Sequence, residues 1–348
     1  MTATVTPRRH LVMRVGAVSL RAPARTVAII AILAVGAAGL AVVAAGTGTY
    51  PVPPADVIGV LTGSNTSFDR VVVLEWRMPR VVMAVLVGAA LGMSGAIFQA
   101  LTHNPLGSPD VIGVNVGAYT GALVAIAGYG GGYYATATGA LIGGLTAAVV
   151  VYALAYQRGL AGFRLIVVGI AVSAVLSSVN QWIIIRIDLH AAVTAAIWQQ
   201  GTLNGQTWAK AVPMMVCLAV AVAALTAMGM RLQVLQMGDD SAGALGVNPD
   251  RTRIGYLIAG VALVAVAAAA AGPISFVALA APQIARALTR SAGVGLVTSA
   301  VFGGFLLLCS DVIAQRAFAP TELPVGAVTV SFGGIYLVYL LITQARRI

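Results

Sequence analysis

The sequence carries little charge, and this scarcity limits what the chain can be. Charged residues make up 9% of the 348 residues, whereas soluble domains carry roughly 25%. Apolar residues make up 59%. A water-facing surface cannot be built from this composition, so a soluble domain is excluded and a polytopic membrane protein is indicated. Each span needs about 20 residues, which leaves room for about ten spans with short connections.

Lysine is almost absent. The single lysine, Lys210, follows Thr207-Trp208-Ala209 and not a glycine-rich loop. A Walker A motif needs the pattern G-x-x-x-x-G-K-[ST], in which backbone amides and the lysine hold the phosphates. The chain therefore cannot bind and split ATP by that route.

Histidine and cysteine are equally scarce. The three histidines are scattered, so no metal cluster or membrane-protease motif can be assembled. Both cysteines lie inside apolar runs and are predicted to be packing residues rather than a disulfide or a metal pair. No nucleophile–base constellation is present either, so we predict no catalytic residue, no metal site and no cofactor bound by this chain. The residues concerned are His10, His103 and His190, and Cys217 and Cys309.

Acidic residues are also few, and hardly any lies within an apolar run. Of the ten acids, only Asp311 and Glu322 fall close to a predicted span, near its external end. Ion-coupled carriers usually keep ionisable groups near the middle of the membrane. An Asp at a helix end is more often a cap or a buried hydrogen-bonding group than a proton relay. Energy coupling inside this chain is therefore not expected.

The stretch around which the rest is organised is RMPRVVMAVLVGAALGMSGAIFQALTHNPLGSPDVIGVNVGAYTG, residues 77–121. Residues 79–100 are uncharged apart from Arg80, and this run is long enough to span a bilayer. Pro105 and Pro109 then forbid a continuous helix. Glycines follow at four-residue spacing, on one helix face that lets a neighbouring backbone approach closely. We expect the two spans to form a packed pair. The glycines are Gly113, Gly117 and Gly121.

The apolar runs of the whole chain predict an all-α polytopic membrane protein with about ten transmembrane helices. A basic cytoplasmic arm (1–26) precedes a single transmembrane domain (27–345), and residues 346–348 form a cytoplasmic C-terminus. The connections 47–78 and 186–207 are predicted to be external. The spans are predicted in the segment with the spaced glycines and at 27–45, 79–100, 133–156, 165–185, 208–229, 254–271, 274–290, 295–318 and 323–345.

The distribution of positive charge predicts the orientation. The net charge of +10 and the pI near 10.2 could suggest nucleic acid as a partner, but the arginines flank apolar runs instead of forming one basic patch. With ten spans and the N-terminus inside, fourteen of the 20 Lys and Arg residues are cytoplasmic and six are external. This agrees with the positive-inside rule. A nine-span arrangement would put Arg346 and Arg347 on the wrong side.

The connection GDDSAGALGVNPDRTR, residues 238–253, is the most informative loop. Asp239, Asp240 and Ser241 are residue types that cap a helix, and Gly246 is a natural stop after it. Asn248-Pro249-Asp250 begins another helix, with a cap, a proline in the first turn and an acid on the dipole. Two short helices that meet at Gly246 would form a rigid knob. It is either an ordinary loop or a handle for a cytoplasmic motor subunit.

A second interruption falls near the C-terminal third of the chain. Gly272-Pro273-Ile274-Ser275-Phe276 ends one span, and Pro282 lies within the next short one. Backbone groups left unpaired inside a membrane are tolerated only where they are buried in protein or line a cavity. The interruption is either a packing kink or an element that lines a pathway.

Four stretches together resemble the permease family of bacterial ABC importers for iron-siderophores, haem and vitamin B12. Residues 77–118 look like the family's second and third helices with their Asn-Pro-Leu turn. LGVNPDRTR (245–253) looks like its coupling loop, GPISFVALAAPQIARALTR (272–290) like its eighth-helix segment, and ELPVGAVTVSFGGIYLVYLL (322–341) like its last helix. The resemblance covers roughly residues 70–345.

The resemblance implies an assembly in the bacterial inner membrane. Two permease subunits of ten helices each would form a central pathway, and two ATPase subunits would dock on the coupling loops and use the ATP. A periplasmic or lipid-anchored binding protein would deliver the cargo. No nucleic acid is implied.

The resemblance also implies roles for particular residues. Arg77 and Arg80 would receive acidic residues of the binding protein, and a third family arginine falls on Gln315, next to Arg316. The segment that contacts the ATPase would include Asp239, Asp240, Ala244, Leu245, Gly246 and Val247. The pathway or its gate would include Asn104, Pro105, Leu106, Gly272, Pro273, Phe276, Pro282 and Gln283.

One departure from the family pattern narrows the expected cargo. Pro282-Gln283 stands where the family commonly has Pro-His, and this variant looks like the ferric-enterobactin-type permease subunit, which pairs with a second, different permease. The expected cargo is therefore a ferric siderophore. The alternatives are an ABC permease for haem or cobalamin and a stand-alone secondary carrier for a metal or metabolite.

Overall fold

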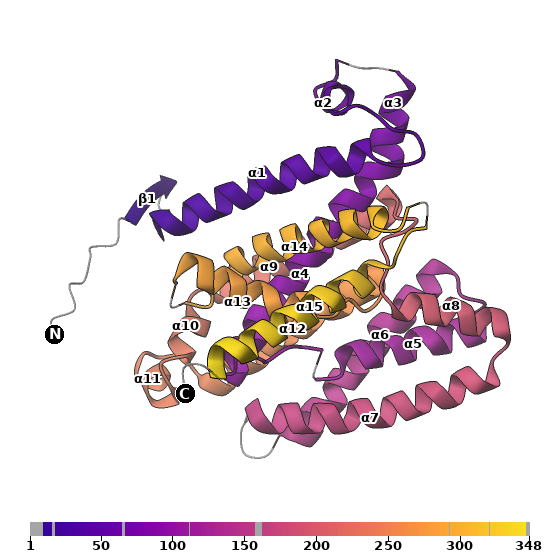
Figure 1. Ribbon diagram of the computed structural model, residues 1–348. Helices are drawn as coiled ribbons and strands as arrows, with labels where there is room; N and C mark the ends of the chain where they lie inside the picture. The colour runs from indigo at the N-terminus through magenta and orange to yellow at the C-terminus, as the bar shows by residue number, and fades with distance from the viewer. Residues whose placement is uncertain are drawn as a thin grey trace.

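The computed structural model describes residues 10–345, apart from 16–17, 65–66, 111, 157–161, 292 and 320. Within this range the long helices follow the apolar runs of the sequence (Figure 1). Arg8, Arg9, Arg158, Arg346 and Arg347, which entered the charge count, lie outside the described residues. The ten helices at predicted spans are α1 (Ala24–Gly46), α4 (Met78–Thr102), α5 (Val114–Tyr129), α6 (Tyr133–Ala155), α7 (Gly162–Arg186), α9 (Trp208–Met228), α12 (Pro249–Ala271), α13 (Val277–Thr289), α14 (Leu296–Arg316) and α15 (Val325–Ala345).

Seven helical segments of the described chain are long and apolar enough to cross a membrane. They are α1, the continuous run Phe68–Thr102 that ends in α4, α6, α7, α9, α12 and α14. Helices α5 and α15 are apolar over shorter stretches, and α13 has 13 residues. The chain is thus a multi-pass membrane protein, and the crossings by α5, α13 and α15 remain a prediction.

The predicted N-terminal arm contains a β-hairpin, which the all-α prediction missed. Strand β1 (His10–Val15) pairs antiparallel with β2 (Val18–Pro23), and Val15 lies opposite Val18. Both strands contain β-branched valines, at Val12, Val15 and Val18, which suit a pleated strand. Helix α1 begins directly after Pro23, at Ala24, so the last residues assigned to the arm are helical.

The expected packed pair of α4 and α5 is wrong, because each of these helices packs chiefly on another partner. The glycine face of α5 lies against α6, where a Cβ at Gly121 would come within 2.0 Å of the Gly139 carbonyl oxygen. Helix α4 lies against α14 in the same way, and a Cβ at Gly88 would come within 2.3 Å of the Gly303 carbonyl oxygen. Close packing needs a small-residue face on both helices, and α6 and α14 supply the matching faces.

The external connection predicted at 47–78 is folded rather than extended. It contains α2 (Pro54–Leu61), α3 (Phe68–Arg70) and the π-helix η1 (Val71–Arg77), which continues into α4. Valines of this region form a small apolar core with the end of α1. The indole N–H of Trp208 also donates to the Leu74 carbonyl at 2.8 Å. The run VVVLEW is apolar enough to extend the helix before the predicted span begins.

The two ends of the bundle carry different small elements. Figure 1 shows the start of α1, the last turns of α15 and the short helices α10 (Arg231–Leu235) and α11 (Asp239–Ala244) at one end. Helices α2, α3 and α8 (Leu189–Gln199) lie toward the opposite end. The segments expected to meet cytoplasmic and external partners are therefore well separated.

Candidate functional site

The loop at 238–253 is folded, as the sequence predicts, but only its first helix, α11, is short, because the second is the start of the long helix α12 (Pro249–Ala271). Helix α11 ends at Ala244, and Gly246 follows with a φ of 76°, the left-handed conformation that favours glycine. The Asn248 side chain accepts a hydrogen bond from the Arg251 N–H at 3.0 Å and caps α12. The stop at Gly246 and the restart at Asn248 are thus confirmed.

The predicted cap at the other end of α11 is wrong. Gly238 is the N-cap, with a φ of 100° and no side-chain cap bond, and Asp239 lies in the first turn. The Asp239 carboxylate instead pairs with Arg253, with 2.8 Å between Oδ1 and Nη2. This exposed pair ties α11 to the first turns of α12. Gly238 takes the cap position because its positive φ is unfavourable for Asp.

The surface of the knob is apolar at its tip. Leu245 is 64% exposed, and Ala244 and Gly246 beside it are exposed as well, whereas Val247 is half-buried. Ala242 is fully buried beneath them. An exposed leucine on a rigid, capped turn is a suitable contact for an apolar socket on a partner protein.

At the opposite end, Arg80 is held by two carboxylates. Its Nε and Nη2 donate to both oxygens of Asp311 at 2.9–3.2 Å, and Nη1 donates to Glu322 at 2.9 Å. The Asp311 side chain is fully buried. Gln315 donates to the same carboxylate at 2.7 Å. The position that departs from the family's third arginine thus helps to hold Asp311, which is the buried hydrogen-bonding group that the sequence favoured.

Arg77 lies nearby but has different partners. It donates to the carbonyl oxygens of Ala45, at 2.7 Å, and Tyr50, at 2.5 Å. Both arginines line a hollow of about 240 Å³ together with Trp76, Gln315 and Glu322. The structure brings Arg77, Arg80 and Gln315 together at one rim, whereas the side chain of Arg316 is exposed and does not line this hollow.

Two of the predicted gate residues, Pro105 and Gln283, are in contact, and Tyr336 joins them. Gln283 on α13 donates to the Pro105 carbonyl at 2.5 Å and accepts a hydrogen bond from the Tyr336 hydroxyl of α15 at 3.2 Å. Asn104 accepts from the Leu106 N–H at 2.9 Å and shapes the turn. Gln283 therefore joins the Asn-Pro-Leu turn to α13 and α15. Pro282 lies within α13 and is buried.

The interruption between α12 and α13 is a tight, buried break. Gly272 has a φ of 75°, and a Cβ there would lie 2.5 Å from the Trp198 carbonyl oxygen. Phe276 also has a positive φ, 72°, which is uncommon for a residue with a side chain. Its ring packs directly on the bare backbone of Gly333 in α15. The unusual backbone of Phe276 is thus fixed by a helix distant in the sequence.

The turn between α4 and α5 also supports this break. The backbone N–H of Phe276 donates to the carboxylate of Asp110, which accepts a second bond from Asn115 Nδ2 at 2.6 Å. Burial raises the pKa of the Asp110 carboxyl to about 6, against the opposing effect of its hydrogen bonds with Ser108 and Phe276. Burial is the largest influence on this pKa, so burial itself sets the direction of the shift.

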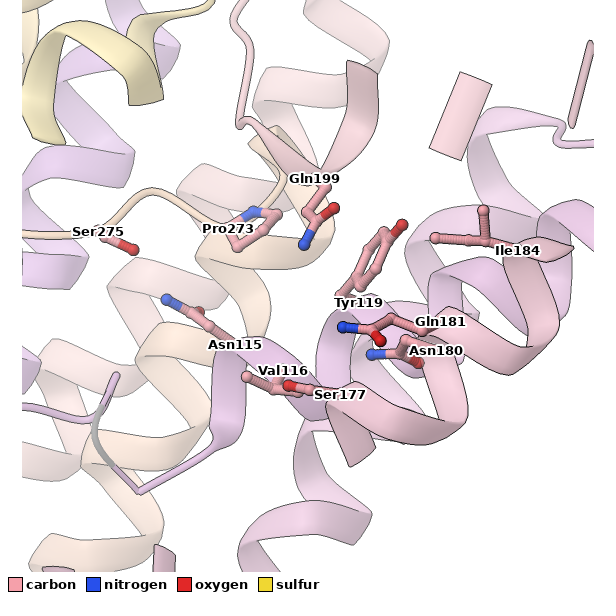
Figure 2. Close-up of a pocket in the computed structure, with 10 residues that line it drawn as sticks. All are labelled: Asn115, Val116, Tyr119, Ser177, Asn180, Gln181, Ile184, Gln199, Pro273 and Ser275. Carbon is pink, nitrogen blue, oxygen red and sulfur yellow. The ribbon is translucent and has the colours of Figure 1, made fainter. Parts of the chain in front are cut away.

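Sequence reasoning missed a polar cavity beside this break. A cavity of about 420 Å³ lies between α5, α7, α8 and the 273–275 segment. Figure 2 shows Asn115 and Tyr119 from α5, Asn180 and Gln181 from α7, and Gln199, the last residue of α8, around it. The signal was present, since Asn180-Gln181 interrupts an apolar run, and polar residues inside a span are generally functional or bonded to a neighbouring helix.

The described residues contain no group of three His, Cys, Asp or Glu side chains that could hold a metal ion. Cys217 and Cys309 are free thiols, and Cys217 is exposed. The cavity and the gate therefore offer hydrogen bonds and apolar contacts, and no ligand set for a bare metal.

Comparison with known proteins gives a consistent result. The model of the FecCD transport family matches residues 32–343. The chain is 46% identical to the ferric enterobactin transport system permease protein FepG of Escherichia coli K12, over 86% of this chain and 91% of that protein. It is 33% identical to the iron(3+)-hydroxamate import system permease protein FhuG of Bacillus subtilis 168, over 84% of this chain and 90% of that protein. A metal-chelate type ABC transporter solved in an inward-facing conformation shares the fold, with a TM-score of 0.81 and 24% sequence identity. The match covers 91% of this chain and 99% of that chain.

Proposed function

The chain belongs to the FecCD transport family, and we propose that it is the permease subunit of an ABC importer for a ferric siderophore. The observation that carries this proposal is the 46% identity to a ferric enterobactin permease over nearly the whole length of both chains. The hydroxamate permease, at 33%, is a more distant relative of the same kind. We infer a catecholate-type chelate as the first cargo to test, with haem and cobalamin as the alternatives.

The proposed topology has ten crossings of the bacterial inner membrane with both termini in the cytoplasm. Helices α5, α13 and α15 complete the ten, although they are short. The short α13 is compatible with this topology because the break at Gly272–Phe276 is covered by α15 and by the Asp110 turn. The common end occupied by the start of α1 and the end of α15 supports an even number of crossings (Figure 1).

A second permease subunit is part of the proposal. Helix α7 leaves Ser178 and Gln181 exposed within a span, next to exposed apolar residues such as Val175 and Trp182. Polar side chains in a span usually face protein or water rather than lipid. We infer that this face of α7 meets the second permease or the pathway between the two subunits.

The remaining partners act at the two ends of the bundle. ATP hydrolysis is proposed to take place on two separate ATPase subunits that grip the knob of α11 through Leu245. A periplasmic or lipid-anchored binding protein would dock at the rim of Arg77 and Arg80. The ion pairs of Arg80 make it the weaker docking residue of the two, because a carboxylate of the binding protein would have to compete with Asp311. The described contacts of Arg77 are with carbonyl oxygens only, so its charge has no such competitor among them.

Uptake of a radiolabelled chelate tests the cargo and the energy source together. The chain is produced with its partner permease, ATPase and binding protein in cells that lack their own ferric siderophore importer. We expect uptake of ⁵⁵Fe-enterobactin that requires this chain and the ATPase, and that excess cobalamin or haem does not reduce. Transport in vesicles by this chain alone, without nucleotide, would instead establish a secondary carrier.

Coupling is tested at the knob. Leu245→Asp places a charge in the proposed contact, where an unpaired buried charge is unfavourable. We expect reduced co-purification of the ATPase and lower uptake, with normal amounts of the permease in the membrane because the residue is exposed. Met237→Asp is a matched control, since Met237 is 68% exposed but lies before the knob. Equal ATPase retention and uptake in the Leu245 variant and the parent would contradict the coupling role.

A further inference from the structure

The cavity between α5, α7, α8 and the 273–275 segment contains buried polar atoms that lack partners. Asn115 Oδ1, Tyr119 Oη and Asn180 Oδ1 have no hydrogen bond in the structure, and their residues are 8%, 4% and 4% exposed. All three residues line the cavity, and Figure 2 shows them around the same space. Three such atoms at one cavity distinguish it from the rest of the described chain.

An unpartnered buried polar group lowers stability, and an apolar group of the same shape would avoid that loss. Leucine or phenylalanine would be at least as stable at these positions if the cavity stayed empty. The chain nevertheless has polar residues from two different helices around one space. This arrangement is expected where the atoms gain their hydrogen bonds from an occupant.

The lining defines the chemistry of that occupant. None of the ten lining residues is Asp, Glu, Lys, Arg, His or Cys, so the cavity offers neither a charge partner nor a metal ligand. The Asn115 amide nitrogen is already bonded to Asp110, which leaves its oxygen for a donor. The two free amide oxygens therefore require N–H or O–H groups on the occupant.

We propose that the cavity is a subsite for the uncharged part of the chelator, outside the iron-bound oxygens, that bears amide or hydroxyl hydrogens. The proposal rests on the function proposed above and adds that the organic shell of the cargo, rather than its iron, is recognised inside the membrane domain. A volume of about 420 Å³ lies within the range of small-molecule sites, roughly 300–1,000 Å³. Because the cavity abuts the break at Pro273–Ser275, this part of the chelator, once bound, would contact the segment that precedes α13.

The test uses the complete transporter in proteoliposomes, with ⁵⁵Fe-enterobactin on its binding protein. The variants are Asn180→Leu and Tyr119→Phe, which remove unpartnered polar atoms and little volume. Thr138→Ala is the matched control on the neighbouring helix α6, because Thr138 is exposed and bonds only its own helix, at Tyr134 and Ala135. Uptake per ATP hydrolysed is measured together with the thermal unfolding midpoint of each variant.

We expect uptake per ATP to fall about fivefold in each variant, the equivalent of one hydrogen bond of about 1 kcal/mol, and to stay unchanged in the control. The unfolding midpoints should equal or exceed that of the parent, because no existing bond is lost. Uptake within twofold of the control would show that the cavity holds ordered water only, and would overturn the subsite while the proposed function stands. A clear drop in midpoint would show a structural role and also overturn it. A parent transporter that moves no ferric siderophore would refute both proposals.

Discussion

The pair formed by Arg80 and Asp311 allows a quantitative test of how α4 and α14 are joined at the rim that also contains Arg77. Asp311 is fully buried and receives three contacts of 2.9–3.2 Å from Arg80. Removal of one partner from a buried pair leaves an uncompensated charge and costs about 3–5 kcal/mol. Glu322 is 44% exposed, and an exposed pair contributes at most about 1 kcal/mol. We therefore expect Arg80→Gln and Asp311→Asn each to reduce the free energy of unfolding by about 3 kcal/mol.

The decisive measurement is a double-mutant cycle, read by equilibrium unfolding in mixed detergent micelles. The double variant Arg80→Gln/Asp311→Asn removes both charges, so it should be less destabilised than the sum of the single variants by about 2 kcal/mol. Arg316→Gln is the control, because that side chain is exposed, and it should have little effect. Additive losses, or single variants within about 0.5 kcal/mol of the parent, would refute the reasoning.

The same variants distinguish two roles of this rim, stabilisation of the helix packing and docking of the binding protein. If Arg80 chiefly stabilises the packing of α4 on α14, Arg80→Gln should lower the free energy of unfolding more than it lowers the affinity for the loaded binding protein. Arg77→Glu should do the reverse, because it places like charges against an acidic partner and slows their association. Unchanged affinity for the binding protein in both variants would remove the docking role from this rim.

Three further outcomes are expected. Because burial raises the pKa of Asp110, its carboxyl keeps the proton to higher pH in the folded chain than in the unfolded chain, where the pKa is about 3.9. The free energy of unfolding should therefore fall by roughly 3 kcal/mol as the pH rises from about 4 past 6. In Asp110→Asn, unfolding midpoints measured over this pH range should no longer show that fall, and identical pH series for variant and parent would contradict the shift. Gly121→Ala should lower the free energy of unfolding by about 1–3 kcal/mol, because the added methyl group forces α5 away from α6. Gly128→Ala should not, because the space around Gly128 is open. Equal unfolding curves for the two variants would argue against the close packing of α5 on α6. With both native cysteines removed, Ser64→Cys should react with an impermeant thiol reagent in intact cells and Ala244→Cys only after permeabilisation, and the opposite pattern would invert the topology.

The helix positions could be predicted because they depend on local composition. Each apolar run lies between charged, proline or glycine residues, and the structure places a helix within a few residues of each predicted span. The stop at Gly246 and the cap at Asn248 were predictable for the same reason, since both act within one turn of chain. The hairpin at the N-terminus lies in a basic arm, and the charge pattern of that arm gives no signal for paired strands.

The helix pairings could not be predicted, because they depend on faces that lie far apart in the sequence. The glycines of α5 indicated close packing correctly, but nothing near them showed that the partner is α6 rather than α4. The Gly303 face of α14, more than 200 residues beyond Gly88, decides where α4 packs. The buried pair of Arg80 and Asp311 is equally distant, so Arg80 alone could be interpreted only as an external arginine.

The break before α13 shows how these distant contacts combine. Phe276 has a backbone conformation that is uncommon for a residue with a side chain. Two segments distant in the sequence contact it there, Asp110 through a hydrogen bond with its backbone N–H and Gly333 through contact with its ring. A conformation held by several segments can change only if those segments move together. Gln283, about two turns further along α13, bonds both the Asn-Pro-Leu turn and Tyr336. Movement of α15 or of that turn, driven from the neighbouring end of the bundle, would therefore be transmitted to the break and to the polar cavity beside it.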